Sequence, residues 1–148
     1  MPETTSTDNI IYSRLLLGEA RHLLVRARKK ELAPYHVSPE QANVLTIIND
    51  LGNKANFTKL VKLTNRKQNT LSIQMKRMEN DGLVKKGRER PKSRELVFEL
   101  TEKGKIICDA AKKIESITTI MSILSKAERQ QLISALEKII SKAEQYLD

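Results

Sequence analysis

The chain has 148 residues, 39% of them hydrophobic and 3% aromatic, and its 27 basic and 18 acidic residues give a net charge of +9. This length lets one ordinary domain bury a core without disulfide bonds or a structural metal, and the single cysteine excludes an internal disulfide. Five glycines and four prolines are too few for the many turns of an all-β barrel or sandwich, whereas the excess positive charge favours a polyanionic partner such as nucleic acid, an anionic membrane or an acidic protein.

The chain opens with a short polar stretch followed by a helical pattern. Residues 1–9 have neither the basic start nor the apolar run of a signal peptide, and we expect them to form a flexible tail. Apolar residues recur at helical spacing over residues 10–32, among them Leu15 and Leu23, and Pro34 ends the pattern. No apolar run approaches the roughly 20 residues of a membrane span, so we expect a cytoplasmic protein without a membrane partner.

Two helix-start signals organise the next part of the chain. Ser38 and Gln41 form a capping box that opens a helix ending at Gly52. After a short helical pattern over residues 57–63, a second capping box with Asn65 as its first residue opens another helix, which closes near Gly82. This second helix buries one apolar stripe, made of Leu71, Met75 and Met78. Two short helices with so tight a link predict a helix-turn-helix.

The period then changes to that of strands. Residues 83–84 and 96–100 are expected to be short strands, because they are apolar and β-prone. Between them lies a highly charged segment, residues 85–94, that Gly87 and Pro91 interrupt. We therefore expect a β-hairpin whose loop projects from the body of the protein.

The last part of the chain predicts two long helices. Thr101 opens the first, and its apolar stripe runs from Ile107 through Ile114 to Leu124; a third capping box at Ser125 opens the second. Both stripes step by three and four residues, which is typical of helix–helix packing.

The positive charge lies almost entirely on the helix-turn-helix and the hairpin. Residues 59–105 contain 14 basic and 6 acidic residues, a net charge of +8 out of +9 for the whole chain. Such a concentration is expected of an element that binds nucleic acid, whereas a membrane-binding segment would need a basic amphipathic helix.

At this point the sequence resembles the MarR family of winged-helix transcription regulators over most of its length. The segment Asn80-Asp81-Gly82-Leu83-Val84 matches the end of that family's recognition helix and the entry to its wing. Arg94 and the segment Leu100-Thr101-Glu102-Lys103-Gly104 match the exit from the wing and the start of the next helix. The terminal helices lie where that family builds its dimerisation domain.

The resemblance implies a mostly α-helical fold with a small β-hairpin. Residues 37–101 would form a winged helix-turn-helix DNA-binding domain, and residues 10–36 and 102–148 a helical dimerisation region. The implied function is binding of pseudo-palindromic double-stranded DNA by a homodimer, most often as a repressor. In that family a small anionic or aromatic effector typically changes the spacing of the two DNA-binding lobes, and the sequence names no such effector here.

Candidate DNA-binding residues lie on the second short helix and on the hairpin. Gln and Asn amides can pair with adenine, whereas Lys and Arg chiefly meet phosphates or a narrow minor groove. The candidates are Lys67, Gln68, Asn69, Thr70, Ser72, Lys76, Arg77, Arg88, Arg90, Lys92 and Arg94. In the family the residue matching Arg94 also braces the wing. The alternative interpretation of all these residues is a solvated helix face and a soluble loop.

Other functions and sites have weaker support in the sequence. An architectural DNA binder without sequence preference and a protein-interaction module built on the terminal helices remain the alternatives. No phosphate loop, nucleophile elbow or His-x-x-x-His pair is present, so we expect neither an enzyme nor a cofactor. We expect Cys108 to be a partly exposed, unreactive helix residue, and His22 and His36 to be surface or packing residues, with an effector contact by His22 as the weaker option.

Overall fold

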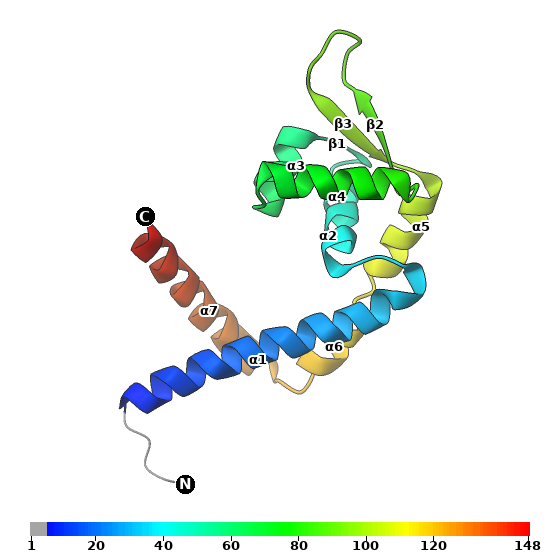
Figure 1. Ribbon diagram of the computed structural model, residues 1–148. Helices are drawn as coiled ribbons and strands as arrows, with labels where there is room; N and C mark the ends of the chain where they lie inside the picture. Colours follow the sequence, from blue (N-terminus) through cyan, green and yellow to red (C-terminus); the bar gives the residue numbers. More distant parts are fainter. Residues whose placement is uncertain (1–5) are drawn as a thin grey trace. The chain divides into compact units, whose positions relative to one another are not determined.

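The computed structural model describes residues 6–148, and Figure 1 shows its helices and strands. In chain order these are α1 (Ser6–Leu32), a 3₁₀ turn (Ala33–Tyr35), α2 (Pro39–Asp50), β1 (Lys54–Asn56), α3 (Phe57–Thr64), α4 (Gln68–Asn80), β2 (Val84–Arg88), β3 (Leu96–Leu100), α5 (Glu102–Ala111), α6 (Glu115–Met121) and α7 (Lys126–Leu147). They fall into two units, one ending at Ile114 and one covering Glu115–Asp148. Within the described residues, every helix is too short or too polar to cross a bilayer.

Helix α1 begins earlier than the sequence predicts. It starts at Ser6, so residues 6–9 of the expected tail are helical, while residues 1–5 of that tail lie outside the described residues. Ser, Thr, Asp and Asn are common at the start of a helix, and this explains why the polar stretch extends α1. The helix ends at Leu32, before Pro34, as predicted.

Helix α2 begins at the predicted capping box. The Ser38 hydroxyl accepts a hydrogen bond from the backbone N–H of Gln41 at 3.1 Å, and the Gln41 side chain accepts one from the backbone N–H of Ser38 at 3.0 Å. Val44, Leu45 and Ile48 on this helix are buried in the core. The capping box at Ser125 is likewise confirmed at the start of α7, where hydrogen bonds from Ser125 lower the pKa of Glu128.

Helices α3 and α4 form the predicted helix-turn-helix, but the capping box proposed at Asn65 is wrong. Asn65 ends α3 with a left-handed backbone, φ 52°, and α4 begins after Lys67, whose side chain makes no capping bond. Asparagine adopts the left-handed conformation more readily than most residues, so here it makes the tight turn between the helices.

A three-stranded antiparallel sheet, in the order β1–β3–β2, takes the place of the expected two-stranded hairpin. The sequence did not predict β1, in which Ala55 lies opposite Phe98 of β3. Strand β2 continues to Arg88, which pairs with Leu96, so residues 85–88 of the predicted loop are strand. Residues 84–100 are called the wing below, and the far end of this hairpin projects beyond the helices of the same unit (Figure 1).

The predicted long helix over residues 101–124 is wrong, because it is broken into α5 and α6. The chain turns at Ile114, whose backbone is left-handed with φ 39°. On α5, Ile107, Cys108 and Ala111 are buried in the core, whereas no residue of α6 is buried. The apolar spacing runs on across the break because both helices are amphipathic, and periodicity alone therefore could not reveal it.

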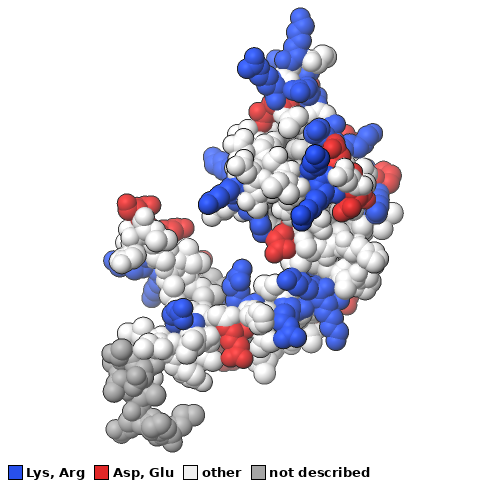
Figure 2. All heavy atoms as spheres, viewed as in Figure 1, with Lys and Arg blue, Asp and Glu red and all other residues white. Residues whose placement is uncertain are grey.

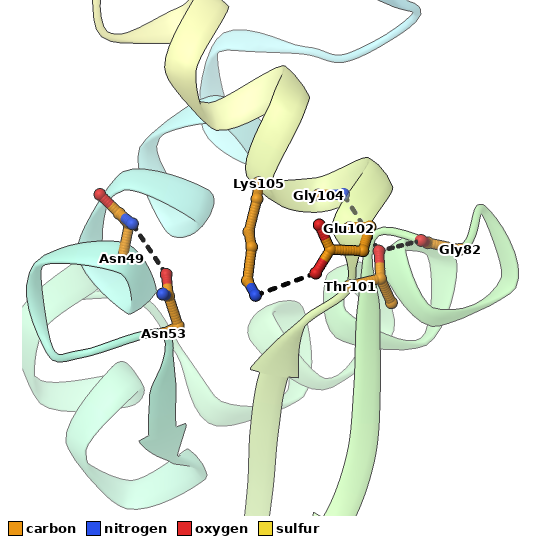
Figure 3. A network of polar contacts seen from close by, with 7 residues as sticks. All are labelled: Asn49, Asn53, Gly82, Thr101, Glu102, Gly104 and Lys105. Atoms are coloured by element: carbon orange, nitrogen blue, oxygen red, sulfur yellow. Dashed lines mark hydrogen bonds and ion pairs between the residues drawn. The ribbon is translucent and has the colours of Figure 1, made fainter.

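The start of α5 is held against the entry to the wing by a set of hydrogen bonds (Figure 3). The Thr101 hydroxyl donates to the carbonyl of Gly82 at 2.5 Å and accepts from the backbone N–H of Gly104 at 3.0 Å. The backbone N–H of Thr101 also donates to the carbonyl of Leu83 at 3.1 Å. A β-carbon on Gly104 would collide with that carbonyl, so only glycine fits at this position.

Cys108 is fully buried rather than partly exposed as expected. It lies on the α5 face that enters the core beside α2. Burial raises the pKa of its thiol, although the nearby Lys112 ammonium acts in the opposite direction. A buried thiol with a raised pKa favours the unreactive protonated form.

Candidate nucleic-acid interface

The orientation of α4 follows from its apolar stripe. Leu71, Met75 and Met78 are all buried, as predicted, and so they turn the opposite side of the helix to solvent. Every candidate on this helix and at its start is exposed: Lys67, Gln68, Asn69, Thr70, Ser72, Lys76 and Arg77. The structure therefore places them at the surface, and their contact with DNA stays a prediction.

Gln68, Asn69 and Thr70 form the first turn of α4. Because Lys67 makes no side-chain capping bond, the backbone N–H groups of this turn have no side-chain acceptor there. These groups and the helix dipole favour negative charge at this end of the helix. The end that carries the amide side chains is therefore also suited to approach a phosphate backbone.

The wing turn is braced by Arg88 and not by Arg94. The Arg88 guanidinium donates to the carbonyl of Ser93 at 2.7 Å, and the backbone N–H of Ser93 donates to the carbonyl of Arg90 at 3.0 Å. Arg94 is exposed and takes part in neither bond. The bracing role implied for Arg94 is thus corrected, while Arg90 and Lys92 are exposed at the turn.

Glu95 joins the wing to the helix-turn-helix, a contact that the amino-acid sequence did not predict. Its carboxylate accepts a hydrogen bond from the backbone N–H of Thr58 at 3.2 Å, and its own backbone N–H donates to the Ser93 hydroxyl at 3.1 Å. The Asn56 side chain caps the same helix end through the N–H of Lys59 at 2.7 Å. Both bonds stabilise the first turn of α3, and the bond from Glu95 also ties the wing to that turn.

Among residues 6–148, the cations of α4 and the wing form no ion pair with an acidic side chain. Ion pairs among the described residues join Arg28 to Glu31, Lys105 to Glu102 and Lys112 to Asp50. None of them involves a DNA-binding candidate. Figure 2 shows Lys and Arg side chains gathered at the tip of the wing and over the helices beneath it. Unpaired, exposed cations of this kind can neutralise phosphates without first breaking an internal ion pair.

Helix α4 stands between two hollows. One, of about 450 Å³, separates it from the start of α2 and is lined by Gln41, Arg66 and Arg77, among others. The other, of about 240 Å³, lies between α4 and the sheet, where the rings of Phe57 and Phe98 are 6.2 Å apart. The helix is therefore a ridge with room on both sides, as insertion into a groove requires.

Comparison with solved structures gives the fold a name. The chain superposes on the organohalide-sensing transcriptional regulator RdhR with its ligand 2,4-dichlorophenol bound, at a TM-score of 0.82 and 22% identity over 95% of this chain and 83% of that one. It matches AbsC, a MarR family transcriptional regulator from Streptomyces coelicolor, at 0.81 and 23% identity over 97% and 99%. A mutant of MarR from E. coli complexed with operator DNA matches at 0.78 and 19% identity over 92% and 99%.

The predicted resemblance is thus confirmed for the fold. No protein-family model matches the chain, and no curated protein does so significantly. The winged helix-turn-helix is the shared architecture.

Proposed function

We propose that this chain, which has the fold of the MarR transcription regulators, is a sequence-specific DNA-binding regulator that binds a pseudo-palindromic operator as a homodimer and represses transcription. The observation that carries the proposal is the outer face of α4, where amide, hydroxyl and cationic side chains are exposed beside a wing of unpaired cations. Base edges in the major groove require donors and acceptors of this kind, and phosphates require the cations. A MarR variant of the same fold has been solved with operator DNA, which supports this assignment.

A footprint on the DNA that flanks the chain's own gene tests the proposal. A regulator should protect a defined site with dyad symmetry, and it should prefer that site to random duplex by about a thousandfold or more. An architectural binder would coat DNA without a defined footprint. A module that works through its terminal helices would bind a protein partner and leave DNA unprotected.

A homodimer is part of the proposal because long apolar faces are left uncovered in each unit. Helix α1 exposes large apolar side chains along one half of its length: Ile10, Ile11, Tyr12, Leu15, Leu16, Leu17 and Leu23. Helix α7 has 22 residues, none of them buried, and it too exposes large apolar side chains. Faces of this extent on a monomer mark an interaction surface, and a second copy is the occupant that a twofold operator requires.

Sedimentation at low micromolar concentration should show a dimer. Leu15→Glu, which places a charge among the apolar side chains of α1, should produce monomers and weaken operator binding. Leu63→Glu is the matched control for the oligomeric state, because Leu63 is 49% exposed on α3 and lies outside the expected dimerisation region, residues 10–36 and 102–148. A wild-type monomer that binds DNA tightly would contradict the dimer.

We also propose that a small anionic or aromatic effector binds in the hollow between α4 and the sheet. Phe57 and Phe98 offer an apolar wall, and Lys76 and Lys86 line the same hollow together with Glu79. The probe is 2,4-dichlorophenol, the ligand of the RdhR structure. It should raise the melting temperature of the wild type, and less so that of Lys86→Ala; an equal rise in both would place the ligand elsewhere.

A further inference from the structure

Ile73 is the one large apolar side chain that α4 turns to solvent among the described residues. It is 60% exposed, whereas Leu71, Met75 and Met78 of the same helix are at most 1% exposed. A single exposed isoleucine is ordinary on a protein surface, so exposure alone says little. Its position says more, because Ile73 lines both hollows that flank α4. It therefore stands on the crest of the ridge, where anything that accepts α4 meets it.

The surroundings of Ile73 restrict what that partner is. Asn69 precedes it by one helical turn, and Lys76 and Arg77 follow it by three and four residues, all exposed on the outward side of the helix. An apolar protein surface laid over Ile73 would have to remove water from those two cations without pairing them, which is costly. DNA can pair both cations with phosphates, and its major groove also offers a small apolar group to the isoleucine.

We propose that Ile73 is a specificity-determining residue that reads thymine through van der Waals contact with its C5-methyl group in the major groove. The proposal rests on the proposed function, since it requires α4 to enter the groove. Among the four bases, thymine alone presents an apolar group there; the other edges present donors and acceptors. An isoleucine against those edges would leave polar groups without partners. Asn69, one turn earlier, carries the amide suited to adenine, so we expect A·T pairs at the centre of each half-site.

The first step of the test selects the site. The full chain is used to enrich duplexes from a random pool, and the enriched sequences are aligned. A shared site with a thymine in each half-site supports both proposals. A pool without any shared site would overturn the proposed function and this inference together.

The second step removes the methyl group alone. Each thymine of the selected site is replaced by uracil, which keeps every hydrogen-bonding group of the base. Loss of one buried methyl contact should weaken wild-type binding about fourfold per half-site and about 15-fold when both half-sites are changed. If no uracil substitution changes the affinity, the Ile73 inference is wrong while the regulator remains.

The third step assigns the methyl contact to Ile73. Ile73→Ala should bind the thymine and uracil sites equally well, whereas Ile73→Val, which keeps two methyl groups, should retain most of the uracil penalty. Ile106→Ala is the matched control, an exposed isoleucine on α5 whose removal should leave the full penalty in place. A uracil penalty that persists in Ile73→Ala would show that another residue reads the methyl group.

Discussion

Replacing Gly104 by alanine is expected to lower the free energy of unfolding by about 3 kcal/mol, among the larger effects of any single substitution in this chain. The β-carbon of the alanine would collide with the carbonyl of Leu83, an atom of the backbone that no side-chain rotation can move away. That carbonyl also accepts the N–H of Thr101, so displacing it disturbs the hydrogen bonds that join α5 to the wing entry. The substitution should therefore destabilise both the sheet and the core.

Urea unfolding of Gly104→Ala beside Gly87→Ala measures this effect. Gly87 lies within β2 with open space around its α-carbon and outside the proposed dimer interface, so alanine there should raise the free energy of unfolding by about 0.5–1 kcal/mol by reducing the backbone entropy lost on folding. The two variants should thus move in opposite directions although the chemical change is identical. A Gly104→Ala protein as stable as the wild type would contradict the close approach.

The close approach of Gly104 to the Leu83 carbonyl explains part of the segment Leu100-Thr101-Glu102-Lys103-Gly104. Thr101 caps α5 and bonds to Gly82, and Gly104 lets the first turn of that helix lie against Leu83. The threonine and the glycine are therefore fixed by one piece of backbone geometry, in which the helix starts beside the strand that enters the wing.

Hydrogen bonds at the start of a helix could be predicted from the sequence where the residues allow only one bonding arrangement. The capping boxes at Ser38 and Ser125 form as expected, because a Gln or Glu three residues later completes the pair of bonds. Asn65 is followed by Gln68 at the same spacing, yet it turns the chain in the left-handed conformation. Asparagine can satisfy either role, and here it makes the turn between α3 and α4.

Other features depend on contacts between residues far apart in the chain, and they could not be predicted from the sequence. Strand β1 has three residues, and only Ala55 among them is buried, so its pairing with β3 leaves no pattern of its own. The turn at Ile114 lies inside an unbroken apolar period, and Cys108 is buried because α5 packs beside α2.

The candidate interface divides in the same way. The polar face of α4 and the charge of the wing follow from helix period and composition, and the structure leaves all eleven predicted residues exposed. Glu95 was missed because its partner, the N–H of Thr58, lies 37 residues away in the sequence. Ile73 was not among the predicted residues, because those were chosen for polar groups that pair with bases or phosphates.

We expect α4 to determine which DNA sequence is bound and the wing to contribute affinity for any DNA sequence. Gln68 and Asn69 lie in the first turn of α4, nearer its start than the capping box at Asn65 had implied, and their amides are exposed. Gln68→Ala or Asn69→Ala should cost about 1–3 kcal/mol on the operator and little on random DNA. Arg90→Ala with Lys92→Ala should weaken binding to both duplexes, because these exposed cations at the wing turn meet phosphates or a narrow minor groove.

Titrations of operator and scrambled duplex at several salt concentrations distinguish the two sets of residues. If a dimer makes about 8 phosphate contacts, the slope of log K against log salt should be about −7 for the wild type, and each lost contact should flatten it by about one. The amide variants should keep the wild-type slope, and Lys138→Ala, an exposed cation on α7, should keep both slope and affinity. Amide variants that lose equal affinity on both duplexes would show that α4 does not read sequence through Gln68 and Asn69. A wild-type slope near −1 would remove the basic face from the interface altogether.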